Sequence, residues 1–67
     1  MKNNKYPYYA IQINGAKNNV FTLRKVVAAG ATNPVDGIRY RTEQKAREAA
    51  GQLGIAIDKV GDSYEIV

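Results

Sequence analysis

One stretch of this 67-residue chain carries a full set of helix signals, and it limits what the rest of the chain can fold into. Thr42 is a natural N-cap, Glu43 places a negative charge in the first turn, and Gly54 can end the helix in a left-handed conformation. Apolar residues between these ends recur at helical spacing, at Ala46, Ala49, Ala50 and Leu53. Small side chains on such a stripe let a helix approach a sheet closely. The sequence therefore predicts one helix, Glu43–Leu53, packed on β-strands.

Alternating residues near the N-terminus predict a strand. In Tyr8–Asn14, the residues Tyr9, Ile11 and Ile13 share one face, a period of two that is typical of a half-buried strand. The segment Asn14–Asn19 begins with Asn-Gly and ends with Asn-Asn, so it is expected to be a turn.

The residues just before the helix predict a loop and then a short strand. A proline and an Asp-Gly pair indicate that Gly30–Gly37 is a loop. Ile38–Arg41 is then a short strand whose isoleucine and tyrosine face inward. The other two side chains, Arg39 and Arg41, are expected to face outward.

The segment Val20–Ala29 allows two interpretations. As a strand, it places Phe21 and Leu23 on one face and Thr22 and Arg24 on the other, and its later residues need a bulge. Its β-branched and aromatic content favours this strand. As a helix, the segment would be capped by an asparagine before it and a glycine after it.

The C-terminal residues predict a hairpin. Ile55–Val60 and Ser63–Val67 flank a Gly-Asp pair, and glycine in the first position of a two-residue loop fits a type II′ turn. Tyr64, like Tyr9 and Tyr40 of the earlier strands, is expected at the core or its edge.

Together these elements predict an α+β fold: a small antiparallel β-sheet of about three strands packed on one α-helix, with a C-terminal β-hairpin. A single domain is expected to span residues 1–67, with Met1–Pro7 as a flexible lead. A chain of this size buries only about 60% of its extended-chain surface, so its stability should be marginal.

The chain is poorly supplied with catalytic groups. It has no histidine and no cysteine, and Ser63, its one serine, falls in the expected tight turn. The acids Asp58 and Glu65 can face each other across the expected hairpin, where two solvated surface carboxylates are the simplest interpretation. We therefore expect no enzyme activity, cofactor or metal site. No stretch is long and apolar enough to be a signal peptide or a membrane span, so a cytoplasmic location without membrane contact is expected.

Charge is the best indication of a partner. The first five basic residues, Lys2, Lys5, Lys17, Arg24 and Lys25, all precede the first carboxylate, and the whole chain has a net charge of +4. A basic half suggests an anionic partner, of which nucleic acid is the commonest, and we expect DNA rather than RNA. The candidate nucleic-acid-binding residues are Arg24, Lys25, Arg39, Arg41, Lys17 and Tyr8, with Gln12 and Thr22 beside them on the sheet face opposite the helix.

Two other roles fit the same composition. An exposed sheet face with arginine and tyrosine also suits a protein interface, as in a phage or mobile-element protein that inhibits or adapts a host protein. Alternatively, edge strands at Tyr8–Asn14 or Ser63–Val67 could pair between chains in a self-assembling protein. The oligomeric state does not follow from the sequence.

The segment Ile38-Arg39-Tyr40-Arg41-Thr42-Glu43-Gln44-Lys45-Ala46 resembles the strand-to-helix junction of the arm-type DNA-binding domains at the N-termini of tyrosine recombinases. The matching positions are Tyr40, Thr42 and Ala46. The resemblance implies a three-stranded sheet on one helix, with the sheet in the DNA major groove. It makes Arg24, Arg39 and Arg41 the candidate DNA contacts. The long loop and the extra C-terminal hairpin depart from that family.

A helical Val20–Ala29 leads to a different resemblance. The element order would then be strand, helix, strand, helix, strand, strand, which is similar to sporulation-related repeat domains. That resemblance implies binding to cell-wall glycan.

Overall fold

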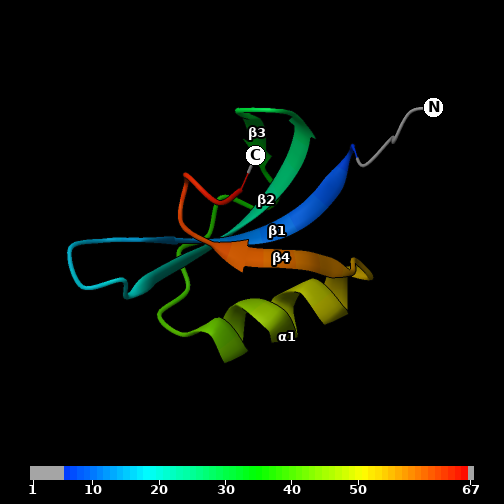
Figure 1. The fold of residues 1–67 in the computed structure, drawn as a ribbon. Helices are drawn as coiled ribbons and strands as arrows, with labels where there is room; N and C mark the ends of the chain where they lie inside the picture. The colour runs from blue at the N-terminus through cyan, green and yellow to red at the C-terminus, as the bar shows by residue number, and fades with distance from the viewer. Residues whose placement is uncertain (1–5, 67) are drawn as a thin grey trace.

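The computed structural model describes residues 6–66 as an α+β fold with a four-stranded mixed sheet and one helix (Figure 1). In chain order the elements are β1 (Tyr8–Asn14), β2 (Val20–Ala28), β3 (Ala31–Pro34), α1 (Glu43–Leu53) and β4 (Ile57–Gly61). The strands lie in the order β3-β2-β1-β4. β2 is antiparallel to both of its neighbours, whereas β4 runs parallel to β1. The α+β class is confirmed, but the sheet has one strand more than expected.

The helix has the predicted bounds and caps. The Thr42 hydroxyl accepts a hydrogen bond from the backbone N–H of Lys45 at 3.1 Å, and Gly54 adopts a left-handed conformation with φ of 76°. Ala46 and Ala50 are buried against the sheet, as their spacing predicts, but Leu53 is 53% exposed. Within the described residues, no helix is long and apolar enough to span a membrane.

The segment after β1 is a strand, and the helical alternative does not occur. Register places Leu23 opposite Ile11 and Phe21 opposite Ile13, so these four side chains share the face that α1 covers. Thr22 and Arg24 therefore lie on the other face, as the strand interpretation predicts. The irregularity that the sequence requires lies between Val26 and Ala28, where the pairing with β3 shifts.

The segment before the helix differs from the prediction. Part of the expected loop Gly30–Gly37 forms β3, and the expected strand Ile38–Arg41 is reduced to a bridge between Tyr40 and Phe21. The bridge consists of two backbone hydrogen bonds of 2.8 Å. Both segments follow the outer edge of β2, and residues 36–39 loop out between them. Ile38, expected to face inward, is 50% exposed in this loop.

The expected C-terminal hairpin is not seen. β4 pairs with β1, and a turn follows it in which the Asp62 carboxylate accepts hydrogen bonds from the backbone N–H groups of Tyr64 and Glu65. This turn places Ile66, 3% exposed, on the sheet face away from α1, and it leaves Tyr64 88% exposed rather than at the core. The last residue of the expected hairpin lies outside the described residues.

The hydrophobic core has two parts, one on each side of the sheet. On the α1 side, Ile11 and Leu23 pack with the helix alanines. On the other side, the buried residues are Tyr8, Ala10, Val26 and Ile66, with Tyr6 packed against them. β1 is central and is paired on both sides, so it is not the free edge suggested by the self-assembly alternative. Of the expected lead Met1–Pro7, residues 1–5 lie outside the described part of the chain.

Candidate nucleic-acid interface

The sheet surface opposite α1 is only partly covered. The C-terminal turn covers the end near Tyr8, and the remainder carries polar side chains. Register places five side chains on this uncovered part, which we call the open face: Gln12 and Asn14 from β1, and Val20, Thr22 and Arg24 from β2. These residues are half-buried in the strands. The sheet thus presents two amides, a hydroxyl and a guanidinium in adjacent positions.

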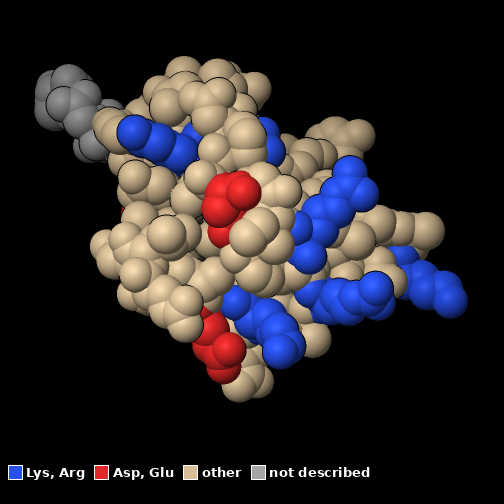
Figure 2. All heavy atoms as spheres, turned by 180° about the vertical axis from the view of Figure 1, so that it is seen from behind, with Lys and Arg blue, Asp and Glu red and all other residues tan. Residues whose placement is uncertain are grey.

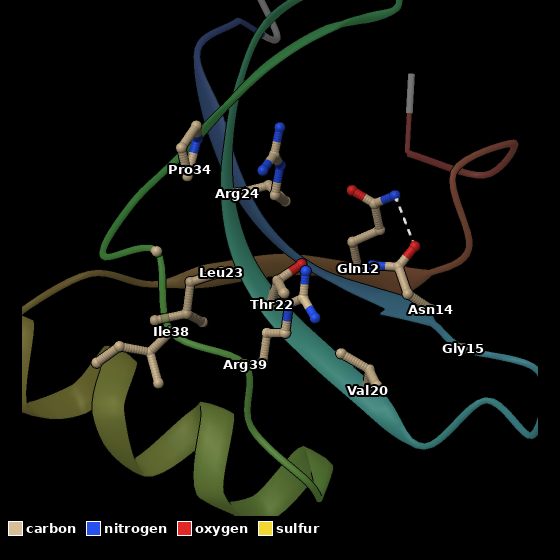
Figure 3. Close-up of a pocket in the computed structure, with 11 residues that line it drawn as sticks. Gln12, Asn14, Gly15, Val20, Thr22, Leu23, Arg24, Pro34, Ile38 and Arg39 are labelled. Carbon is tan, nitrogen blue, oxygen red and sulfur yellow. Dashed lines mark hydrogen bonds between the residues drawn. The ribbon is translucent and has the colours of Figure 1, made fainter.

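The open face is hollowed rather than flat. A depression of about 530 Å³ lies over it, and its polar lining comes from Gln12, Asn14, Thr22, Arg24 and Arg39. Figure 3 shows the side chains of β1 and β2 in the middle, with Pro34 and the following connection on one side and the end of β1 on the other. Among the described residues, no carboxylate lines the depression. It is therefore suited to an anionic or polar ligand.

Arg24 is held in place by β3. Its Nε donates to the Thr32 hydroxyl at 3.1 Å, and its Nη2 donates to the same hydroxyl at 2.8 Å and to the Thr32 carbonyl at 3.2 Å. These contacts hold one edge of the guanidinium against β3. Because the side chain is already ordered, binding to it costs little conformational entropy.

Arg39 is placed by the loop that precedes the helix. The Asp36 carboxylate accepts a hydrogen bond of 2.6 Å from the Tyr40 hydroxyl and one of 3.1 Å from the backbone N–H of Ile38. Both contacts tie the loop to itself on either side of Arg39. The hydrogen bond to Asp36 raises the pKa of Tyr40, and burial and the nearby negative charge act in the same direction.

This contact predicts a change in stability at alkaline pH. A raised folded-state pKa means that the native state favours the protonated phenol, so the contribution is complete below about pH 10 and is lost as pH rises through the folded-state value. We expect Tyr40→Phe to lower the free energy of unfolding by about 1 kcal/mol near neutral pH. The difference between wild type and variant should shrink above about pH 10, in urea unfolding followed by circular dichroism. A difference that stays constant across that range would contradict the assignment.

The structure brings together some of the sequence-predicted residues and separates others. Arg24 and Arg39 line the same depression. Arg41 is exposed directly after the Tyr40 bridge, and Lys17 is exposed in the β1–β2 turn. Figure 2, the view from behind Figure 1, shows basic side chains gathered on the half of the molecule that carries this turn.

Lys25 and Tyr8 lie elsewhere. Lys25 pairs with Tyr9, and both alternate onto the α1 side of the sheet. Tyr8 lies on the sheet face away from α1, but it is only 8% exposed. It stacks on Tyr6 and belongs to the core beneath the C-terminal turn. Neither side chain is part of the open face.

Three residues of the site were not singled out from the sequence. Asn14 reaches the open face because the alternation of β1 continues to its last residue, and its side chain accepts a hydrogen bond from Gln12 at 3.2 Å. Thr32 orients Arg24, and Asp36 orients the loop of Arg39. The Asp-Gly turn signal marked the position of Asp36, but nothing in the sequence indicated that Thr32 would lie beside Arg24.

No family model, curated protein or solved structure matches this chain. The described residues also contain no group of three or more side chains that could hold a metal ion. The chemistry of the open face is therefore the basis for a function.

Proposed function

We propose that this protein is a small, non-enzymatic DNA-binding protein, an accessory factor that contacts DNA through the open face. The observation that carries the proposal is the acid-free depression in which Arg24 and Arg39 lie beside amide and hydroxyl side chains. Guanidinium groups bind phosphate oxygens strongly, and amides and hydroxyls can contact bases, sugars or phosphates. Arg41 and Lys17 extend the positive surface beyond the depression.

The proposal predicts a defined dependence of DNA affinity on salt. If Lys17, Arg24, Arg39 and Arg41 each neutralise about one phosphate, the logarithm of the association constant should fall with the logarithm of salt concentration at a slope of roughly −3 to −4. Fluorescence anisotropy with a labelled DNA at several salt concentrations measures this slope. Binding that does not change with salt, or no binding at low salt, would argue against the proposal.

A protein partner is the second candidate, in the role of a phage or mobile-element protein that inhibits or adapts a host protein. It is favoured by exposed large side chains, since Tyr64 is 88% and Ile38 is 50% exposed. Aromatic side chains and arginine are enriched in protein interfaces. If this alternative is correct, the wild-type protein should fail to bind DNA at low salt, and Arg39→Glu with Arg41→Glu should weaken a protein complex instead.

A further inference from the structure

The shape of the open face bears on which form of DNA it accepts. The bases of a duplex are read inside a major groove about 12 Å wide and 8.5 Å deep, so a protein element has to project into that groove to reach them. The open face is instead the floor of a depression, with the connection after β3 on one side of it. A duplex lying across the opening of the depression would place its phosphates against the exposed arginines and would not reach the side chains on the floor.

An unpaired nucleotide fits the depression in both size and chemistry. The volume of the depression, about 530 Å³, lies within the range of small-molecule sites, about 300–1,000 Å³. The Gln12 and Asn14 amides and the Thr22 hydroxyl supply donors and acceptors on the floor. Base edges can use such groups once they are free of a complementary strand.

The two arginines complete the match. Arg24 is fixed by Thr32 at one side of the floor, whereas Arg39 is exposed and reaches the depression from the connecting loop. Both guanidinium groups can contact phosphates, and the exposed, planar group of Arg39 can also stack on a base. A sugar-phosphate backbone that passes Arg24 would thus leave its base between the amides and Arg39.

We propose that the depression holds one unpaired nucleotide, so that the protein prefers single-stranded DNA to duplex DNA. This inference rests on the proposed function and adds the form of DNA that the same site selects. It also departs from the duplex major-groove mode implied by the resemblance to arm-type domains.

The test compares one labelled, non-self-complementary DNA strand, free and annealed to its complement, at the same low salt concentration. We expect the free strand to bind about tenfold more tightly than the duplex, because base contacts are added to the phosphate contacts. Two variants address the depression itself. Gln12→Ala removes an amide from the floor. Thr22→Ile replaces the hydroxyl on the floor with a larger apolar group and keeps a β-branched residue in the strand.

Both variants should lower the affinity for the free strand by about tenfold, with little change for the duplex, because neither alters a charge. Gln52→Ala, on the exposed surface of α1, is the matched control for loss of an amide and should change neither affinity. Circular dichroism melts establish that each variant is folded.

The outcomes separate this inference from the proposed function. Equal or tighter binding of the duplex overturns the single-strand preference and leaves the DNA-binding proposal standing. A preference for the free strand that survives both floor variants overturns the location of the nucleotide. If neither DNA binds at low salt, the proposed function fails and the inference fails with it.

Discussion

Ile11→Ala is expected to lower the free energy of unfolding by about 2–5 kcal/mol. Ile11 is fully buried in the central strand β1, opposite Leu23 and against Ala46 and Ala50 of α1. Truncation leaves a cavity under a helix whose contact residues are alanines, and these have no long side chains with which to refill it. A 67-residue domain is stable by only about 3–10 kcal/mol, so the variant should lose a large part of its stability.

The matched control is Ile38→Ala, the same change at a side chain that is 50% exposed. It should cost within about 0.5 kcal/mol, as surface substitutions usually do. Urea unfolding of both variants and the wild type, followed by circular dichroism, gives the two differences. Equal losses at the two positions would show that the core is not where the structure places it.

These two isoleucines also show which parts of the fold the sequence predicts. The alternation of β1 and the capped helix are local patterns, and both elements appear with their expected bounds. The inward position predicted for Ile38 relied on a strand that tertiary pairing replaces, because β3 already occupies the edge of β2 and Asp36 ties the next residues into a loop. The alternation of residues within one segment does not show which of two segments pairs with the edge of β2.

The hairpin predicted at the C-terminus does not form, for a related reason. A glycine followed by aspartate is a good hairpin signal, yet Ile57–Gly61 pairs in parallel with a strand more than forty residues earlier in the chain. Parallel pairing across a helix leaves no mark at the turn itself. The Asp62 side chain then accepts hydrogen bonds from the backbone N–H groups of Tyr64 and Glu65, and Ile66 packs with Tyr8.

The candidate site was predicted in part. Strand alternation correctly places Arg24 and Thr22 on the face away from α1. Lys25 adds to the positive charge of the N-terminal half, but a residue adjacent to Arg24 in a strand must point to the opposite face. Tyr8 has an aromatic ring of the kind that can contact bases, but Ile66 packs with it in the core. Charge and residue type therefore identify the basic region, and register decides which of its members can act together.

The second large effect is expected from charge reversal at Arg39, which lines the depression, and at Arg41, an exposed residue two positions later; we call this double substitution the rim variant. Arg39→Glu combined with Arg41→Glu should weaken DNA binding by about 100-fold at low salt and reduce the magnitude of the salt slope by about two units, because two phosphate contacts are lost and two repulsions are added. Both residues are exposed, so the fold should persist. Fluorescence anisotropy across a salt series measures the affinity and the slope together.

The control must carry the same total charge, because the double change lowers the net charge of the chain from +4 to zero. Lys45→Glu with Arg47→Glu does the same on α1, where the change removes an exposed Arg47–Glu43 pair that contributes little. Its affinity should fall far less, and its slope should stay close to that of the wild type, because the open face is unchanged. If the helix variant loses as much affinity as the rim variant, DNA responds to the overall charge of the chain, and the open face is not its binding site.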